Sequence, residues 1–329
     1  TSSSASEEAA SDGCSTTAVS LSGTAASTGT VRGRAKSTAA AAVRLFNVKT
    51  DNREKNDTFR VCDMQTDTVS VMTADEYIFG VLAAEMPALY ENEALKAQAV
   101  AAYTLACRRR ADNKDKSYDI TTDYTVDQSY ITRSEAKKRW GDKYDEYSKK
   151  LEKAVGDVKN LAVTYNGEPI TAVYHAISSG KTEDSRDIWG GELPYLKAVS
   201  SPGDKLSPDY ASEVSVSAEE LKRKLGSECT LSGDPAAYFG EPERTDSGSV
   251  LTVSVCGNEI TGGKIRSIFN LRSLNFSVKY TDGNFVFTVL GYGHGVGMSQ
   301  YGANYMAKQG SDFKEILTYY YTDCKVERL

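Results

Sequence analysis

The alanine-rich run NEALKAQAVAAYTLACRRR, residues 92 to 110, constrains this fold more than any other segment of the chain. The run predicts a helix, and because small side chains are spread around it, neighbouring elements must pack closely on several sides. The three arginines at its end suit a helix C-terminus, where cations interact favourably with the carbonyl dipoles. The segment therefore predicts a helix that is enclosed by other elements rather than lying on a surface.

A shorter helix is predicted just before it, over TADEYIFGVLAAEMP at residues 73 to 87. Thr73 and Glu76 form a capping-box pattern at its start, and Pro87 ends it. Glu85 lies two residues before that break, among apolar neighbours. Burial there would raise the pKa of its carboxyl group toward the range useful for donating a proton, although a surface glutamate at a helix end is the simpler alternative.

Glycine stands at every second position in GYGHGVG, residues 291 to 297. If this segment is extended, its glycines leave one face bare while Tyr292, His294 and Val296 share the other. Four alternating glycines indicate that a ligand or another part of the protein approaches the backbone closely. A tight strand crossing or an irregular turn is the alternative interpretation.

The remaining pattern favours an α+β fold. LAVTYNGEPITAVYHA, residues 161 to 176, predicts a hairpin with its turn at Asn166 and Gly167, and residues 134 to 158 predict a charged helix. Strands and helices do not alternate regularly, so a doubly wound sheet is not expected. We expect one domain over 43–329 with a cleft between two lobes, which span 43–200 and 201–290. A glycine-rich strand and a helix over 291–329 then close the fold.

Residues 1–42 consist mostly of Ser, Thr, Ala and Gly and predict a flexible tether. No run of about 18 apolar residues is present, so we expect any membrane anchor to lie upstream of this sequence. The formal net charge of -6 argues against nucleic-acid binding. The whole chain contains 40% hydrophobic residues, which is enough apolar content for a core in the part beyond the tether.

The six cysteines form no CxxC pair and no metal-ligand cluster, so neither a metal nor a cofactor is expected. Cys229 with Cys256, or Cys62 with Cys324, are the pairs that an oxidising compartment would allow to bridge. The sequence GKT at residues 180 to 182 lacks the upstream glycine of a phosphate loop. A triad of Ser178 or Ser179 with a histidine lacks the Gly-x-Ser-x-Gly elbow.

Three blocks in order resemble the stage II sporulation protein D family (SpoIID), the peptidoglycan lytic transglycosylases of spore-forming bacteria: AAEMPALYENEALKAQAVAAYTLA, SSGKTEDSRDIWGGELPYLKAVSSPGD and GYGHGVGMSQYGANYMA. The resemblance runs from about Val43 to Cys324. It places the catalytic acid at Glu85. It also suggests substrate-binding roles for a set of residues in or near these blocks: Tyr103, His175, Ser178, Ser179, Gly180, Tyr195, Lys197, His294, Ser299, Gln300 and Tyr301.

The resemblance implies cleavage of glycan strands that lack stem peptides, with 1,6-anhydro ends as product, during forespore engulfment. It implies a membrane-tethered protein outside the cytoplasm, at the sporulation septum, and a companion amidase or endopeptidase. Tyr103 stands where the family commonly has an arginine facing the acid, which favours the alternative of a non-catalytic glycan-binding or amidase-enhancing module. A secreted structural envelope protein is the third alternative.

Overall fold

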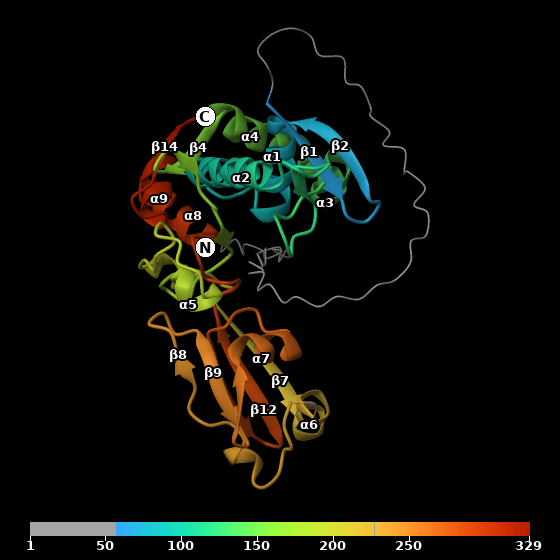
Figure 1. Cartoon of the computed structure of the whole chain (residues 1–329), viewed down its shortest axis with the longest axis vertical. Helices are drawn as coiled ribbons and strands as arrows, with labels where there is room; N and C mark the ends of the chain where they lie inside the picture. Colours follow the sequence, from blue (N-terminus) through green and yellow to red (C-terminus); the bar gives the residue numbers. More distant parts are fainter. Residues whose placement is uncertain (1–56, 227) are drawn as a thin grey trace, which may run out of the picture.

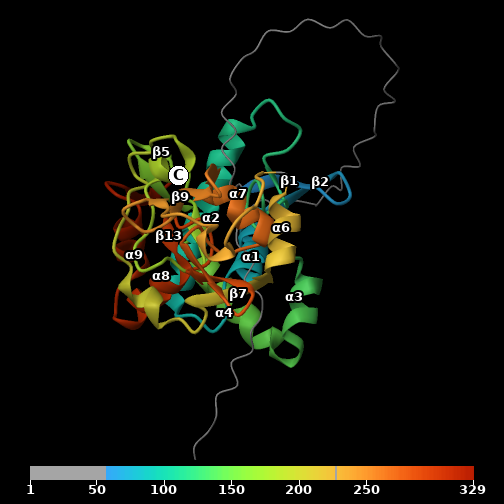
Figure 2. The ribbon, with the colours of Figure 1, turned by 90° about the horizontal axis from the view of Figure 1, so that it is seen from below.

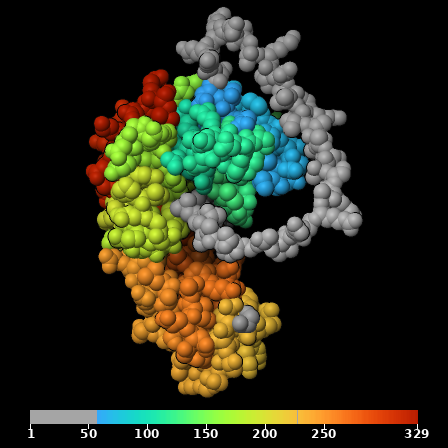
Figure 3. Space-filling view, in the orientation of Figure 1, coloured from blue at the N-terminus to red at the C-terminus, as the bar shows by residue number. Residues whose placement is uncertain are grey.

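The computed structural model describes residues 57–226 and 228–329, and within them the fold mixes helices and strands in two lobes stacked along the long axis (Figures 1 and 3). Each lobe has its own cluster of buried apolar side chains. The first lobe combines residues 57–207 with 291–329, and residues 211–290 form a lobe inserted between these two segments. The predicted tether 1–42 and the start of the predicted domain lie outside the described residues.

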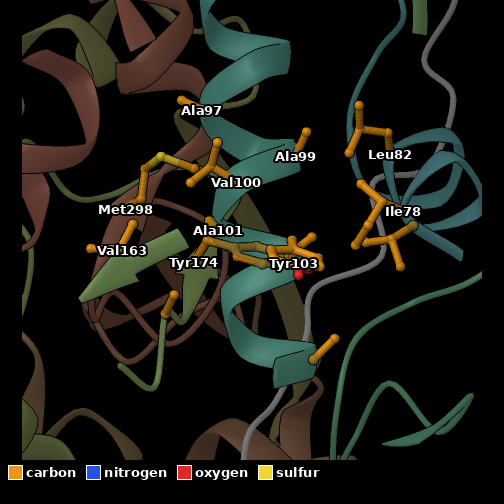
Figure 4. Packing of buried hydrophobic residues seen from close by; sticks show 14 of the residues in the cluster. Ile78, Leu82, Ala97, Ala99, Val100, Ala101, Tyr103, Val163, Tyr174 and Met298 are labelled. Atoms are coloured by element: carbon orange, nitrogen blue, oxygen red, sulfur yellow. The ribbon is translucent and has the colours of Figure 1, made fainter. Parts of the chain in front are cut away.

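Helix α2 (Asn92–Asp112) is the centre of the first lobe. It packs against α1 (Ala74–Glu85), α4 (Tyr144–Asp157), α8 (Gln300–Lys308), α9 (Phe313–Tyr320) and β4 (Leu161–Tyr165). Figure 4 shows its small side chains between Met298 on one side and Leu82 of α1 on the other. Small side chains let these elements approach closely at the density of a protein interior. The predicted enclosed helix is confirmed.

The first lobe also contains short strands and helices. Three small sheets are formed by β1 (Thr58–Asp63), β2 (Thr68–Thr73) and β3 (Ile120–Thr121); by β4, β5 (Glu168–Pro169) and β14 (Lys325–Arg328); and by β6 (Tyr174–His175) with β13 (Met298–Ser299). The remaining helices are α3 (Arg133–Trp140), α5 (Ser185–Trp189) and the 3-10 turns η1 (Gly141–Lys143) and η2 (Pro202–Leu206). Figure 2 shows α3 projecting from the side of the molecule.

Local signals explain several of these boundaries. The hydroxyl of Thr73 accepts the Glu76 N–H at 3.3 Å, which caps α1 as predicted, but the reciprocal half of the predicted capping box is not formed, because the Glu76 carboxylate pairs with Arg133. The turn between β4 and β5 has positive φ at Asn166 (52°) and Gly167 (82°), as the predicted hairpin requires. The single charged helix expected over 134–158 is wrong, because Gly141 adopts φ 51° and divides it into α3 and α4.

The inserted lobe contains two three-stranded antiparallel sheets. Their strand orders are β11 (Phe276–Thr281), β12 (Asn284–Leu290), β7 (Ala211–Ser217) and β10 (Asn258–Thr261), β9 (Val250–Val255), β8 (Glu243–Arg244). Helices α6 (Ala218–Leu225), α7 (Gly262–Phe269) and the turn η3 (Pro235–Ala237) accompany them. Buried and partly exposed residues alternate along β12, and its buried Phe285 and Phe287 lie in an aromatic core.

The five cysteines within the described residues are all unpaired, so neither candidate disulfide is formed. Among the helices of the described part, none is both long and apolar enough to cross a bilayer.

Candidate active site

Glu85, the last residue of α1, is almost completely enclosed, with 2% of its surface exposed. Its Oε1 accepts the backbone N–H of Ser129 at 2.7 Å. Burial and, after it, the Glu85 charge raise the pKa of the Tyr174 hydroxyl well above its ordinary value. Glu85 is therefore a buried acid with a fixed orientation and not a surface glutamate at a helix end.

The segment 121–131 covers this end of α1 and is fixed by buried polar groups. Gln128 donates to the Tyr77 hydroxyl at 3.0 Å and accepts from the Tyr174 hydroxyl at 2.8 Å. Asp127 accepts the Thr121 backbone N–H at 2.8 Å, and its other oxygen pairs with Arg109 at 2.8 Å. These bonds hold the Ser129 N–H against the acid.

Sequence reasoning missed Gln128, Ser129 and Tyr174. A polar segment without helical or strand periodicity gives no local signal, and its partners Glu85 and Ser129 are 44 residues apart.

The glycine-rich segment is not the extended strand that its spacing suggested. Gly291, Gly293, Gly295 and Gly297 all have positive φ, at 79°, 122°, 80° and 74°. A side chain on Gly291 would stand 2.8 Å from the Ile177 carbonyl oxygen, and one on Gly297 would meet the Val173 carbonyl. The glycines therefore allow the chain to turn repeatedly beside residues 173–183, which means that they accommodate protein backbone.

The two histidines lie together in this crossing. His175 Nδ1 is 3.1 Å from the Val296 carbonyl oxygen, and His294 Nδ1 accepts the Val296 N–H at 3.1 Å. Their ring centroids are 5.7 Å apart, and the Trp189 ring lies 5.3 Å from His294. Burial lowers the pKa of His175 to about 4 and holds that of His294 well below its ordinary value. Both imidazoles are therefore neutral near pH 7.

Asp204 of η2 organises the predicted serines. One carboxylate oxygen accepts the Ser178 N–H at 3.0 Å and also the Ser178 hydroxyl, and the other accepts the Ser299 hydroxyl at 2.7 Å. Ser299 in turn caps α8 by accepting the Gly302 N–H at 3.1 Å. Burial raises the pKa of Asp204, and the serine hydrogen bonds oppose that effect. These hydroxyls join the segment after β6, strand β13 and η2, and sequence reasoning missed their common partner.

The other predicted residues lie around this core. Ser179 donates to the Ser247 carbonyl at 3.0 Å, and Gly180 has φ 100°. The Tyr195 hydroxyl accepts the Thr171 N–H at 3.1 Å. Lys197 pairs with Glu192 at 2.7 Å.

Residues of α8 extend the same core. Gln300 donates to Gln98 of α2 at 3.5 Å, and the half-buried Tyr301 donates its hydroxyl to the Leu206 carbonyl at 3.2 Å. Of the predicted residues, His175 and His294 lie together in the glycine-rich crossing, and Ser178 and Ser299 share Asp204 as their acceptor.

Tyr103 of α2, which stands where the family commonly has an arginine, makes its contacts at the start of β1. Its hydroxyl donates to Asp57 at 2.6 Å, and its ring packs edge-to-face on Phe59 at 6.0 Å. Burial and, after it, the hydrogen bond to Asp57 raise the pKa of this hydroxyl. The tyrosine therefore ties α2 to the entry of β1. No group of three potential metal ligands occurs within residues 57–226 and 228–329.

At the junction of the lobes, Glu183 and His294 from the first lobe and Ser249 and Asn275 from the inserted lobe line a crevice. Its volume of about 10 Å³ holds one water molecule and no sugar ring. This part of the junction is closed.

Comparisons with known proteins show the family of this chain. The family model described as SpoIID, stage II sporulation protein, matches residues 62–165, which contain α1, α2 and the segment above Glu85. The stage II sporulation protein D of Bacillus subtilis (strain 168) is 38% identical over 79% of this chain and 76% of its own length. That of Bacillus amyloliquefaciens is 39% identical over 77% and 74%. The chain belongs to the stage II sporulation protein D family.

A more distant relative carries a different name. The amidase enhancer of Bacillus subtilis (strain 168) is 27% identical over 74% of this chain and 39% of that protein. Relatives of this chain therefore include both a sporulation protein and an amidase enhancer. Membership of the family does not by itself identify the chemistry, which has to be inferred from the site.

Proposed function

We propose that this protein is a peptidoglycan lytic transglycosylase in which Glu85 is the only catalytic carboxylate. The observation that carries the proposal is the enclosed carboxylate of Glu85, held at 2.7 Å by the Ser129 N–H at the end of α1. A sporulation family and a buried, oriented acid together favour glycan cleavage over a purely structural role.

One carboxylate is sufficient for this chemistry. Ordinary glycosidases use two, one as the acid and one as the nucleophile or base. In a lytic transglycosylase the protonated acid gives its proton to the glycosidic oxygen while the bond from that oxygen to the anomeric carbon breaks. The carboxylate then takes the proton of the sugar's own 6-hydroxyl, whose oxygen bonds to the anomeric carbon. The attacking group already belongs to the substrate, so proximity assists the step.

The surroundings of Glu85 suit a group that must first give and then take a proton. Burial favours the neutral acid, whereas the Ser129 N–H favours the carboxylate. With only 2% of Glu85 exposed, part of its cover has to move before a glycan arrives. The segment 121–131 is that cover, and it carries the exposed side chains of Tyr124 (50%) and Val126 (45%).

The test is the substitution Glu85→Gln, assayed by mass spectrometry of 1,6-anhydro ends released from glycan strands without stem peptides. The amide oxygen still accepts the Ser129 N–H, but no acidic proton remains, so release should fall by at least about 100-fold. Glu76→Gln is the matched control, because it makes the same change in the first turn of the same helix, on a partly exposed side chain that pairs with Arg133, and should keep full activity. Undiminished release by Glu85→Gln would overturn the assignment.

The second candidate is a non-catalytic module that binds glycan and assists an amidase. It is favoured by the similarity to the amidase enhancer and by the absence of an arginine at position 103. Binding to the strands without new anhydro ends in the wild-type protein would support this candidate. By either function we propose a membrane-tethered location outside the cytoplasm during engulfment, with a companion amidase or endopeptidase that prepares the strands.

A further inference from the structure

The inserted lobe, together with Tyr292 of the first lobe, forms an open pocket that the proposed chemistry does not use. Its volume is about 540 Å³, and its lining includes Arg266, Arg272 and Tyr292. Arg266 lies in α7, which Figure 1 shows at the end of the inserted lobe that faces the first lobe. The pocket therefore lies on the side of the inserted lobe nearest to the proposed active site.

Arg266 is a half-buried cation without an acidic partner among the described residues. Its Nε donates to the Leu271 carbonyl at 3.2 Å and its Nη2 to the Arg272 carbonyl at 3.2 Å. These two bonds fix the plane of the guanidinium and leave Nη1 without a partner in the described part of the chain. The guanidinium is partly shielded from water and has no counter-charge among the described residues, so an anion from outside would stabilise this arrangement.

Arg272 adds a second cation to the same pocket. Its guanidinium lies 5.1 Å from the centroid of the Tyr292 ring. The nearest carboxylate, on Asp209, is 3.4 Å away, and both side chains are exposed, so this ion pair contributes little. A pocket with two guanidinium groups and one aromatic face suits an acidic sugar, since its ring can lie on the tyrosine while its anion pairs with the arginines.

The pocket adjoins the crossing that contains the histidines. Tyr292 donates its backbone N–H to the Ile177 carbonyl at 2.7 Å and precedes His294 by two residues. Arg266 is one of the groups, after burial and His175, that lower the pKa of His294, so its charge lies close to that ring. A strand of linked sugars that occupies this pocket would continue toward the first lobe.

We propose that the pocket of Arg266 and Arg272 binds a carboxylate of the glycan strand on a sugar other than the one cleaved. This inference rests on the proposed substrate of the protein. The muramic acid units carry a lactyl ether, whose end is a free carboxylate when the stem peptide is absent and an uncharged amide when the peptide is attached. Because guanidinium groups pair with the carboxylate and not with the amide, the pocket selects strands from which peptides have been removed.

The experiment compares two forms of the same glycan strands. Strands treated with an amidase have free lactyl carboxylates, and coupling these to methylamine removes the charge while the length is kept. The wild-type chain should bind the charged strands at least about tenfold more tightly, as expected for charge-assisted hydrogen bonds. Arg272→Gln and Arg266→Gln should each remove most of this preference, whereas Arg272→Lys should keep part of it.

Arg244→Gln is the matched control, because the hydrogen bonds of this arginine within residues 57–226 and 228–329 also go only to carbonyls, those of Gly248 at 2.7 Å and Phe276 at 2.8 Å, but it lies outside the pocket. It should keep the preference of the wild type. If Arg266→Gln unfolds the inserted lobe because its two carbonyl bonds are lost, Arg272→Gln is the decisive variant.

Equal affinity of the wild type for the two forms, or an unchanged preference in folded Arg272→Gln, would overturn the proposal. Counting anhydro ends in parallel separates the two hypotheses. Cleavage without a charge preference contradicts the pocket alone, and a charge preference without cleavage contradicts the transglycosylase alone.

Discussion

The two lobes are stabilised by different kinds of interior. Among the described residues, the buried polar side chains of the inserted lobe are Ser249 and Ser273, whereas those of the first lobe include Glu85, Asp204 and both histidines. The inserted lobe has an aromatic core in which Phe269 and Phe287 stack at 4.8 Å. The first lobe thus keeps costly buried polar groups that the inserted lobe does without.

This difference indicates a division of labour. Polar groups in an interior have to be paired, and each pair fixes a specific geometry, as Asp204 does for Ser178 and Ser299. An apolar core gives stability without orienting any reactive group. The first lobe is therefore suited to chemistry, and the inserted lobe to presenting a surface such as the pocket around Arg266.

The largest expected effect tests whether the lobes are stabilised separately. Phe287→Ala removes a fully buried ring from the inserted lobe and should cost about 3–5 kcal/mol of its unfolding free energy. Both tryptophans of the chain, Trp140 and Trp189, lie in the first lobe, so their fluorescence follows that lobe while far-UV circular dichroism follows both. In urea, the circular dichroism transition should split or move, and the tryptophan transition should move much less.

Equal shifts of the circular dichroism and tryptophan transitions would mean that the two lobes unfold as one unit and are not stabilised separately. Phe79→Ala, which removes a buried ring of α1, is the matched substitution and should move the tryptophan transition.

The second prediction concerns pH. His175 has a pKa of about 4 in the folded chain and about 6.5 when unfolded, so the unfolded state binds more protons between these values. The stability of the first lobe should therefore fall as pH drops from 6.5 toward 4, by up to about 3 kcal/mol from this residue. Urea titrations followed by tryptophan fluorescence measure the slope.

His175→Asn should reduce that slope, since asparagine does not titrate. The inserted lobe, residues 211–290, contains no histidine and should not show this contribution. An identical slope in the variant would show that other groups cause the acid sensitivity.

The parts of the fold that were predictable from sequence are those with local causes. Caps, turns and composition act over a few residues, which is why the α1 cap at Thr73, the turn at Asn166 and the enclosure of α2 were predicted correctly. The division of the charged helix at Gly141 was missed, because a glycine inside a helical pattern does not by itself show that its φ is positive.

The candidate site was less predictable, because its contacts join distant segments. Asp204 and Ser299 are 95 residues apart, and Glu85 and Ser129 are 44 apart. The glycine alternation correctly indicated a close approach of backbone, but period two suggested an extended strand and the positive φ values show repeated turns instead. The acid itself was identifiable, since a helix end next to Pro87 within an apolar segment is a local pattern.

The third prediction tests the polar centre of the first lobe. Asp204→Ala leaves the Ser178 and Ser299 hydroxyls without their buried acceptor and should cost about 2–3 kcal/mol, visible in the tryptophan transition. Ser273→Ala is the control, because this buried hydroxyl donates to the Leu290 carbonyl of its own lobe at 2.6 Å, and it should leave that transition nearly unchanged. If Asp204→Ala were as stable as the wild type, the polar centre would not be what holds the segment after β6, strand β13 and η2 together.

The smallest effect compares two equivalent caps. Thr73 accepts the Glu76 N–H at the start of α1, and Thr261 accepts the Lys264 N–H at 3.2 Å at the start of α7. Each change to alanine should cost about 1 kcal/mol. Thr73→Ala should act on the tryptophan transition and on anhydro release, because α1 carries Glu85. Thr261→Ala should act on the circular dichroism transition and on the charge preference, because α7 carries Arg266. If Thr73→Ala and Thr261→Ala changed anhydro release and the charge preference equally, the lobes would not have separate roles, because a weakened cap destabilises chiefly the helix that it begins.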